Sequence, residues 1–381
     1  MKAKCHQIGF KVIGMKKILC IMQLPPPLHG ASQSNSNLSK SQLINSSYSL
    51  EIINLQFAAS VAELKSFSFT KIWKALKYGL TIWKKVQTFK PDLVYFTLSP
   101  DGFAFYRDAL YTAIVKILGY KVLFHLHGKG IKKASENSPF KKSIYQLVFK
   151  NTEVICLTTS LFSDIEDVYF TKPFIVPYGI YVDHESFNAN PKGNNRKVQI
   201  LYLGNYKESK GVLILINALD ILKKKGLDFH ARIVGDAGDL SVDDLMKYVE
   251  NRSLQDCVEI TGPRYGTEKY LEYKAADIFA FPTFYSNEAF PLVNLEAMQF
   301  GLPVISTNEG GIAAAIVDNE TGFVIEPKNL DQLTDKLATL IVNKELRHRM
   351  GSKAKEVFFD QYTLQHFEHN LKNVFEIVLN K

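Results

Sequence analysis

Short apolar runs alternate with amphipathic stretches along almost the whole of this 381-residue chain. Apolar runs bounded by polar residues are typical of strands buried on both faces of a sheet. The first half predicts strands at Lys17–Leu24, Leu50–Leu55, Leu93–Leu98, Val122–Leu126, Val154–Leu157 and Phe174–Val176. The second half predicts strands at Val198–Leu203, His230–Val234, Val258–Ile260, Ile278–Phe281, Pro303–Ser306 and Phe323–Ile325. Helical periodicity fills most intervals, and this alternation predicts an α/β fold of parallel sheets covered by helices on both faces.

A polar break interrupts the alternation at residues 188–196, which read N-A-N-P-K-G-N-N-R. Because this composition is typical of a linker, we predict a first domain over residues 1–187 and a second over residues 197–358. Residues 359–381 are expected to form a C-terminal helix that packs back on the first domain. Both domains are predicted to be doubly wound and Rossmann-like. Ligands of such sheets bind beyond the carboxyl ends of the strands, so two facing sheets would place the site in the interdomain cleft.

The composition is that of an ordinary globular protein, with 46% hydrophobic and 22% charged residues. The apolar segment after Lys17 resembles the start of a signal peptide, but it is short and ends at Pro25, so a buried first strand explains it better. The chain has no apolar run of about 18 residues, and no transmembrane helix is predicted. Four widely spaced cysteines fit neither a disulfide framework nor a zinc site, which favours a reducing, cytoplasmic location.

Two carboxylates lie eight positions apart in the mostly apolar segment from Asn287 to Thr307. A strand ends before this segment, and helical periodicity begins near Pro291, a residue that suits the first turn of a helix. Glu288 is therefore expected in the loop, and Glu296 in the second turn, leaning back towards the helix start. Free N–H groups at a helix start favour phosphate, and carboxylates accept hydrogen bonds from hydroxyl groups. This combination suits a nucleotide sugar.

The run E-A-F-P-L-V-N-L-E resembles the E-x7-E signature of the retaining glycosyltransferases of family four, which have the GT-B fold. The segments L-E-A-M-Q-F-G-L-P-V-I-S-T-N-E-G-G-I and D-N-E-T-G-F-V-I follow in the family's order. The resemblance covers nearly the whole chain. It implies that Glu288 contacts the donor hexose near the reacting carbon and that Glu296 holds the ribose hydroxyls. It also implies that the N–H groups of Phe290, Leu292 and Val293 face sugar or phosphate. Alternatively, both acids are solvated charges that flank a helix.

The segment L-G-N-Y-K-E-S-K-G, residues 203–211, resembles the family's G-R-x5-K-G phosphate-binding element. The resemblance implies that Lys210 neutralises diphosphate charge and that Asn205 belongs to the donor site. Asn205 stands where the family usually has arginine, and it supplies a hydrogen bond but no charge. Lys207 and Arg264 are candidates to replace that charge. This departure keeps open the alternative that the protein binds a nucleotide sugar without transferring it.

Two further segments resemble family elements in the first domain. P-P-P-L-H-G-A-S-Q-S, residues 25–34, resembles the glycine loop under the donor phosphates, and Gly30 would let backbone approach the ligand. An ordinary turn is the alternative. H-L-H-G ends a predicted strand, and His127 matches the histidine that touches the donor sugar. His125 lies on the same face of that strand and is interpreted as a core histidine.

The resemblance implies a retaining hexosyltransferase that uses a nucleotide diphosphate sugar and a glycan or lipid-linked acceptor, as in surface polysaccharide or glycolipid synthesis. It favours a front-face mechanism, in which the leaving phosphate takes the acceptor's proton. The chain has no D-x-D pair, so neither a metal nor another cofactor is predicted. The alternatives are a non-catalytic GT-B subunit that binds a nucleotide sugar, and a GT-B epimerase or phosphorylase.

Positive charge is concentrated in the first half of the chain. Residues 1–190 contain 23 Lys and Arg against 12 Asp and Glu, whereas residues 191–381 contain 23 against 26. Trp73, Leu76, Leu80, Trp83 and Val86 recur at helical spacing in a lysine-rich segment, which is typical of contact with an anionic membrane. We expect peripheral binding to the inner face of the membrane. An ordinary helix that covers the sheet is the alternative, and no recognition motif supports a nucleic-acid partner.

Overall fold

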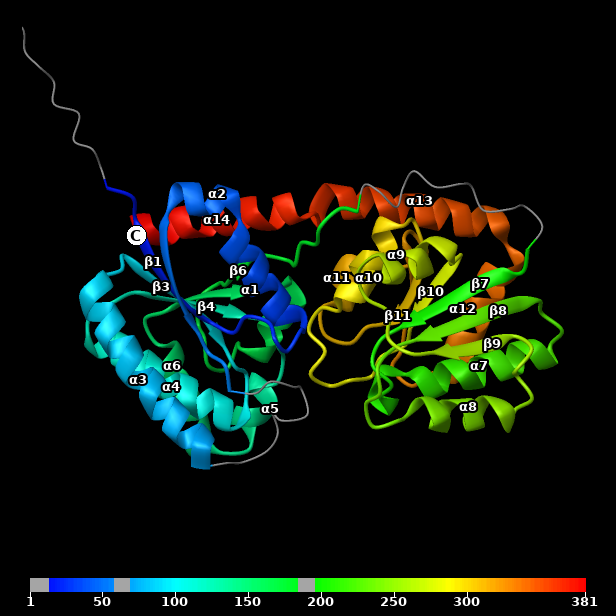
Figure 1. Ribbon diagram of the computed structural model, residues 1–381, viewed down its shortest axis with the longest axis horizontal. Helices are drawn as coiled ribbons and strands as arrows, with labels where there is room; N and C mark the ends of the chain where they lie inside the picture. Colours follow the sequence, from blue (N-terminus) through cyan, green and yellow to red (C-terminus); the bar gives the residue numbers. More distant parts are fainter. Residues whose placement is uncertain (1–13, 58–68, 184–195) are drawn as a thin grey trace, which may run out of the picture.

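The computed structural model describes residues 14–57, 69–183 and 196–381. Three features of the sequence lie outside the described residues. They are Cys5, residues 188–195 of the predicted linker, and the beginning of the lysine-rich segment that contains Trp73. The described chain forms two α/β domains that lie side by side, each built around one sheet (Figure 1). In the described part of the chain, no helix is both long and apolar enough to cross a bilayer.

The first sheet has six parallel strands in the order β2-β1-β3-β4-β5-β6. Ile18 pairs with Leu50 on one side and with Leu93 on the other, so β1 lies inside the sheet. Its strands are β1 (Lys17–Met22), β2 (Ser49–Asn54), β3 (Leu93–Leu98), β4 (Val122–Leu126), β5 (Glu153–Cys156) and β6 (Phe174–Ile175). Its helices are α1 (Gly30–Lys40), α2 (Gln42–Ser47), α3 (Phe69–Phe89), α4 (Gly102–Ile117), α5 (Ile131–Glu136), α6 (Pro139–Phe149) and the 3₁₀ helix η2 (Thr159–Asp164).

The second sheet also has six parallel strands, in the order β12-β11-β10-β7-β8-β9. Its strands are β7 (Val198–Leu203), β8 (Phe229–Val234), β9 (Val258–Thr261), β10 (Ile278–Phe281), β11 (Val304–Thr307) and β12 (Gly322–Ile325). Its helices are the 3₁₀ helix η4 (Glu208–Lys210), α7 (Val212–Lys224), α8 (Val242–Glu250), α9 (Gly266–Ala275), α10 (Leu292–Gln299), α11 (Ile312–Ala315), α12 (Leu330–Val342) and α13 (Lys344–Gln361). The first three strands lie on one side of the sheet and the last three on the other, which is the Rossmann order.

The last helix, α14 (Leu364–Asn380), returns to the first sheet. Figure 1 shows α13 along the second domain and α14 along the first, so that the chain crosses between the domains a second time. Phe367, Leu371 and Phe375 of α14 share a buried cluster with Ile18 and Tyr95 of the sheet. Burial of these apolar side chains fixes α14 on the first domain.

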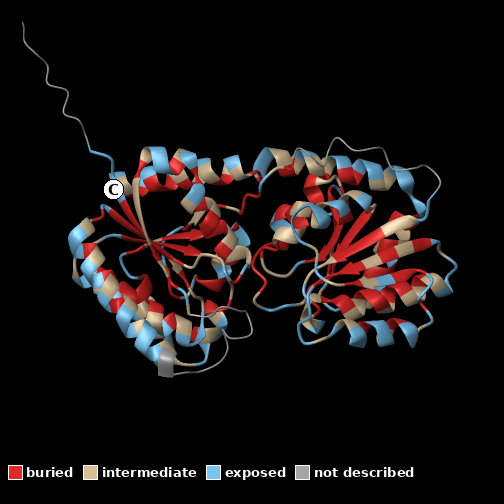
Figure 2. Ribbon diagram, in the orientation of Figure 1, coloured by how far each residue is buried: buried red, intermediate tan, exposed pale blue. Residues whose placement is uncertain are grey.

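The cores lie between the sheets and their helices. Figure 2 shows the strands of both sheets as largely buried and the outer sides of the helices as exposed. Strand β1 illustrates why, because all residues from Ile18 to Met22 are fully buried. Strands covered on both faces expose only their ends, and the loops at those ends therefore carry the polar side chains that remain available to a ligand.

Candidate functional site

The candidate site lies where the strand order of the second sheet reverses. β7 and β10 are neighbours there, but their connections leave in opposite directions along the sheet. The loop after β7 contains residues 204–211, and the loop after β10 contains residues 282–291. Crevices at such reversals are the usual ligand sites of open parallel sheets. The topology therefore brings together the two segments whose motifs the sequence analysis singled out.

Lys210 and Glu288 meet at this reversal. Lys210 Nζ donates a hydrogen bond to Glu288 Oε2 and forms an ion pair with it. The Thr283 hydroxyl lies 3.4 Å from the same carboxylate oxygen. Glu288 is only 9% exposed, and the Lys210 ammonium also lies 4.7 Å from the centre of the Tyr285 ring. A buried carboxylate needs such a partner, because leaving it unpaired away from water is costly.

Two glycines allow the loops around this pair to pack closely. Gly211 follows Lys210 with a φ of 81°, and a Cβ there would overlap the carbonyl oxygen of Pro282. Gly310 has a φ of 59°, and a Cβ there would overlap the carbonyl oxygen of Glu288. Only glycine fits both the backbone conformation and the contact. The G-G-I segment of the sequence, residues 310–312, thus packs directly against the backbone of the loop that carries Glu288.

Helix α10 supplies backbone donors beside the pair. It begins at Leu292, with Pro291 as its N-cap, so the N–H groups of Leu292 and Val293 have no acceptor within the helix. Phe290 immediately precedes this turn. Glu296 lies in the second turn, where it accepts hydrogen bonds from Lys269 Nζ at 2.5 Å and from the Tyr273 hydroxyl at 2.8 Å. Glu296 is therefore held by a neighbouring helix instead of being a solvated charge.

His127 lies across from these loops, just beyond the end of β4. Its Nδ1 is 3.0 Å from the Tyr178 hydroxyl, and the two rings are stacked with centroids 5.4 Å apart. Its Nε2 is buried and has no hydrogen-bond partner among the described residues. The Tyr178 ring also meets the Phe290 ring edge-on, with centroids 6.1 Å apart. Tyr178 thus joins a first-domain histidine to the beginning of α10.

Burial keeps both partners of this contact uncharged. It lowers the pKa of His127 well below its usual value, and the neighbouring His125 and His29 lower it further. Burial also raises the pKa of the Tyr178 hydroxyl, and the nearby Glu288 carboxylate adds to that rise. A neutral imidazole and a neutral phenol follow near pH 7. His125 is fully buried, with its Nδ1 2.7 Å from the Tyr95 hydroxyl, so it is a core histidine as expected.

The first domain differs from expectation around Gly30. The sequence pattern predicts a loop at Gly30, but this residue is the first of α1. His29 caps this helix, because its Nδ1 accepts a hydrogen bond from Ser32 N at 3.3 Å and its own N–H donates to the Ser32 hydroxyl. A Cβ at Gly30 would lie 3.4 Å from the Tyr178 hydroxyl. The glycine thus lets the start of α1 approach Tyr178.

Asn205 and its suggested substitutes are less closely engaged with the pair. Asn205 is exposed, and its carbonyl oxygen accepts a hydrogen bond from Lys207 N at 2.8 Å. Arg264 lies 3.7 Å from Glu272, which Arg232 also binds.

Among the described residues, no group of three or more His, Cys, Asp or Glu side chains is arranged to hold a metal ion.

Contacts between the two domains close around the site. Lys129, just after His127, forms an ion pair with Glu309, which follows β11. The Ser160 hydroxyl donates to the Gly310 carbonyl at 3.2 Å. The carboxyl edges of the two sheets therefore face each other. Sequence reasoning missed Tyr178 and the Lys129–Glu309 pair as parts of one site, because these partners lie far apart in the chain and only the fold brings them together.

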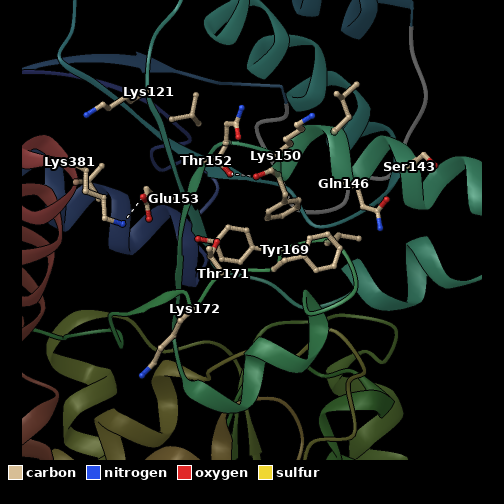
Figure 3. Close-up of a pocket in the computed structure, with 17 residues that line it drawn as sticks. Lys121, Ser143, Gln146, Lys150, Thr152, Glu153, Tyr169, Thr171, Lys172 and Lys381 are labelled. Atoms are coloured by element: carbon tan, nitrogen blue, oxygen red, sulfur yellow. Dashed lines mark hydrogen bonds and ion pairs between the residues drawn. The ribbon is translucent and has the colours of Figure 1, made fainter.

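A cavity of about 960 Å³ lies away from this site, in the first domain (Figure 3). It is lined from the ends of β4, α6 and α14 and from residues 168–172. Two residues on its wall locate it, because Lys121 immediately precedes β4 and Glu153 is the first residue of β5. The cavity therefore lies at the amino edge of the sheet. Because ligands of parallel sheets bind at the opposite edge, this cavity is not the site described above.

Comparison with known proteins connects the second domain to one family. Residues 183–357 match the family described as glycosyl transferases group 1. The chain is 33% identical over 161 residues to a D-inositol 3-phosphate glycosyltransferase of Corynebacterium glutamicum, covering 41% of this chain and 38% of that protein. It is 28% identical over 222 residues to a lipopolysaccharide 1,2-N-acetylglucosaminetransferase of Salmonella typhimurium, covering 53% of this chain and 57% of that protein. The chain thus matches less than two thirds of each relative's length.

Solved structures resemble the chain over nearly its whole length. A glycosyltransferase from Rickettsia africae superposes with a TM-score of 0.76 at 20% identity, covering 96% of this chain and 99% of that one. An Anabaena protein in complex with UDP-glucose superposes with a TM-score of 0.67 at 18% identity, covering 94% and 99%. At these identities the likeness concerns the fold alone. It confirms the predicted GT-B arrangement of two Rossmann-like domains.

Proposed function

The chain belongs, through its second domain, to the glycosyl transferases of group 1, and from this premise we propose that it transfers a hexose from a nucleotide diphosphate sugar to a glycan or lipid-linked acceptor. The transfer retains the anomeric configuration and needs no metal. The observation that carries the proposal is the buried Lys210–Glu288 pair at the start of α10. Support also comes from the UDP-glucose complex of one structural neighbour and from the lipopolysaccharide transferase among the relatives.

The donor's diphosphate binds at the start of α10 in this proposal. The N–H groups of Phe290, Leu292 and Val293 and the ammonium of Lys210 donate to its oxygens. Helix starts and ammonium groups both favour phosphate. Glu296 accepts hydrogen bonds from the ribose hydroxyls, held in place by Lys269 and Tyr273. Asn205 adds an uncharged donor after β7.

Glu288 binds the hexose. When Lys210 turns to the diphosphate, the carboxylate is available to the sugar hydroxyls near the reacting carbon. Charge-assisted hydrogen bonds of this kind are about twice as strong as neutral ones. The ion pair therefore keeps a charged lysine and a charged carboxylate in place, one for each part of the donor. Neither group alone would be stable at such low exposure.

The chemistry replaces one bond to the anomeric carbon with another. The bond from that carbon to the phosphate oxygen breaks, and the leaving phosphate keeps the electron pair. The acceptor hydroxyl oxygen forms the new bond on the same face, and its proton passes to the leaving phosphate. Lys210 and the start of α10 stabilise the charge that develops on the phosphate, in a site arranged before the reaction begins.

His127 and Tyr178 position the sugar from the first domain. When the Tyr178 hydroxyl donates to Nδ1, the proton of the neutral imidazole lies on Nε2. This buried N–H has no protein partner among the described residues, so a sugar oxygen satisfies it. Tyr178 thereby fixes the tautomer that donates to the ligand.

Metal independence has a direct test. Lys210 and the helix start carry the charge of the leaving group in this proposal, so EDTA is expected to leave the transfer rate unchanged within experimental error. The control is the same assay with added Mg²⁺ or Mn²⁺. A strict requirement for either ion would contradict the proposed charge stabilisation.

The activity itself is tested in two steps. A thermal-shift screen of nucleotide diphosphate sugars identifies the donor, because a ligand that binds only the folded state raises Tm. Hydrolysis of that donor is then followed without acceptor. Slow release of free hexose is expected of a transferase, since water can replace the acceptor hydroxyl. Binding without any release, and without transfer to acceptor, would show that the protein only binds the nucleotide sugar.

A further inference from the structure

Three helices of the first domain form an outer layer away from the second domain. Figure 1 shows α3, α4 and α6 side by side on that flank. A Cβ at Gly79 of α3 would lie 3.6 Å from Ile114 of α4, so these helices pack closely. Phe105 of α4 stacks on Tyr145 of α6, with ring centroids 3.6 Å apart. The layer is therefore continuous, and we call its solvent-facing side the outer face.

Helix α3 exposes large apolar side chains on the outer face. Trp73 is 75% exposed, and Leu80 is 64% exposed. Ile72, Leu76 and Trp83 are also exposed and recur at the same helical spacing. The buried side of α3 is formed by Ile82 and Val86. The sequence pattern groups Val86 with the exposed apolar residues of this helix. In the structure Val86 is buried and does not belong to the exposed stripe. Both tryptophans of the chain lie on this helix and on its outer side.

Helices α4 and α6 extend this apolar surface. On α4, Phe103 is 80% and Ile117 is 84% exposed, and Leu110 between them is also exposed. On α6, Phe140 and Leu147 are exposed. Monomeric proteins rarely expose contiguous apolar surface of this kind, and where they do it marks an interaction site. The sequence pattern predicts an apolar contact surface on α3 alone, whereas in the structure the exposed apolar side chains extend over three helices.

The exposed charges on the three helices are all positive. Lys74, Lys77 and Lys84 are exposed on α3, and Lys141 is exposed on α6. The only carboxylate in the three helices is Asp108, which is fully buried and bonded to Arg107. Lys85 differs from these lysines, because it is held in an ion pair with Glu51. The outer face thus combines apolar side chains with uncompensated positive charge.

A basic rim continues at the ends of α4 and α6. Lys116 Nζ ties these ends together by donating to the carbonyls of Val148 at 2.7 Å and Lys150 at 2.6 Å. The cavity in Figure 3 is lined by Leu147 and by Lys121, Lys150, Lys172 and Lys381. Lys381 is paired with Glu153. The lysines at this edge add positive charge next to the apolar surface.

The geometry points to the outer face as a docking surface for a bilayer that carries anionic lipids. Aromatic and aliphatic side chains suit the headgroup boundary, and lysines beside them attract anionic headgroups. A second copy of the chain would oppose like charges, because a two-fold contact brings the same surface to itself. Nucleic acid would leave the apolar side chains in water. A bilayer satisfies both the apolar and the charged parts of the face.

Cosedimentation with vesicles tests this surface independently of catalysis. We expect the protein to bind vesicles of phosphatidylcholine mixed with phosphatidylglycerol, and to bind pure phosphatidylcholine much less. Raising the salt to about 0.5 M is expected to weaken binding, since exposed charges are screened. No donor is present, and Glu288→Gln is expected to bind vesicles like the wild type. A failure of the proposed transfer therefore leaves this measurement unaffected.

Two triple variants locate the contact. The first variant combines Lys74→Ser, Lys77→Ser and Lys84→Ser. It is expected to partition to anionic vesicles roughly tenfold less or weaker still, since each lysine attracts anionic headgroups independently of the others. Replacing Trp73, Leu80 and Phe103 together with serine is expected to lower binding to a similar degree. The matched control for charge replaces the exposed lysines of the second domain, Lys225, Lys247 and Lys344. The matched control for apolar surface replaces Met246, Leu271 and Val342, which are exposed in the second domain.

Each remaining outcome overturns the assignment. Equal binding to both kinds of vesicle, binding to neither, or losses no larger than those of the controls would all exclude anionic-membrane docking by this face. Light scattering of the wild type and of the apolar variant gives a further check. A wild-type dimer that the variant converts to a monomer would show that a second copy covers the face. Unchanged Tm in every variant confirms that the changes act on binding.

Discussion

At the scale of single residues, the site depends on a few side chains that compensate one another. Glu288 and Lys210 are both largely buried, and each is acceptable there because the other neutralises it. The sequence predicted both as site residues, because each belongs to a motif of its own. The contact between them could not be predicted, since 78 positions separate them and only the neighbouring positions of β7 and β10 bring them together. Tyr178 could not be predicted as a partner of His127 for the same reason, since 51 positions separate them.

Lys210→Ala is expected to lower kcat/KM about tenfold or more. The variant removes a charged hydrogen bond to the diphosphate, worth about 1.5–3 kcal/mol, from the transition state. Steady-state kinetics with the donor found in the thermal-shift screen measures the effect, and Lys225→Ala, a change of an exposed lysine, is the control. An effect below about threefold would mean that Lys210 only balances the charge of Glu288.

The buried His125 is expected to make the fold sensitive to mild acid. Burial lowers its pKa from 6.5 to about 3, so below pH 6.5 the unfolded chain binds a proton that the folded chain does not. Stability then falls as the pH falls from about 6.5 towards 3, by about 1.4 kcal/mol per pH unit. The drop in Tm between pH 7.5 and pH 5 is expected to be smaller in His125→Gln than in the wild type. The exposed His369→Gln is expected to behave as the wild type does, and equal drops in all three proteins would refute this cause.

At the scale of elements, the positions of the strands could be predicted from the sequence. Which helix faces are covered by another element could not. All the predicted strands are present, with ends that differ by at most two residues, because a strand buried on both faces must be a continuous apolar run. β1 ends at Met22 instead of Leu24, since Leu24 N donates to the side chain of Asn54 and no longer to a strand. The apolar outer faces of α4 and α6 were not predicted, because an apolar stripe in a sequence does not say whether another element covers it.

Gly310→Ala is expected to destabilise the loop under Glu288. The backbone there has a positive φ, and the new Cβ would overlap the Glu288 carbonyl oxygen, so the folded state is destabilised by more than about 1 kcal/mol. Thermal unfolding measures the loss, and donor affinity is expected to fall with it. Gly262→Ala is the control, because a Cβ at Gly262 has open space around it. A Gly310→Ala protein as stable and active as the wild type would show that this loop is free to move away from Glu288.

At the scale of the whole molecule, the proposed donor site is divided between the two domains. The second domain supplies Lys210, Glu288 and the start of α10, and the first domain supplies His127 and Tyr178. The Lys129–Glu309 pair joins the two domains around this arrangement. The chain also returns from α13 to α14, which packs on the first domain. The alternation of elements predicted parallel α/β sheets, and the polar break at residues 188–196 predicted two domains. Which surfaces face each other depends on contacts between distant segments, and these the sequence did not reveal.

Glu288 is proposed to act on the sugar and not on the nucleotide, and Glu288→Gln separates these two roles. The amide keeps the shape of the side chain but loses the charge, so we expect transfer at saturating donor to be nearly abolished. Affinity for the free nucleoside diphosphate, measured by calorimetry, is expected to change less than about threefold, because the diphosphate contacts remain. Glu250→Gln, which changes an exposed carboxylate on α8, is expected to behave like the wild type in both assays. Near-normal turnover by Glu288→Gln at saturating donor would show that the Glu288 carboxylate does not act on the sugar.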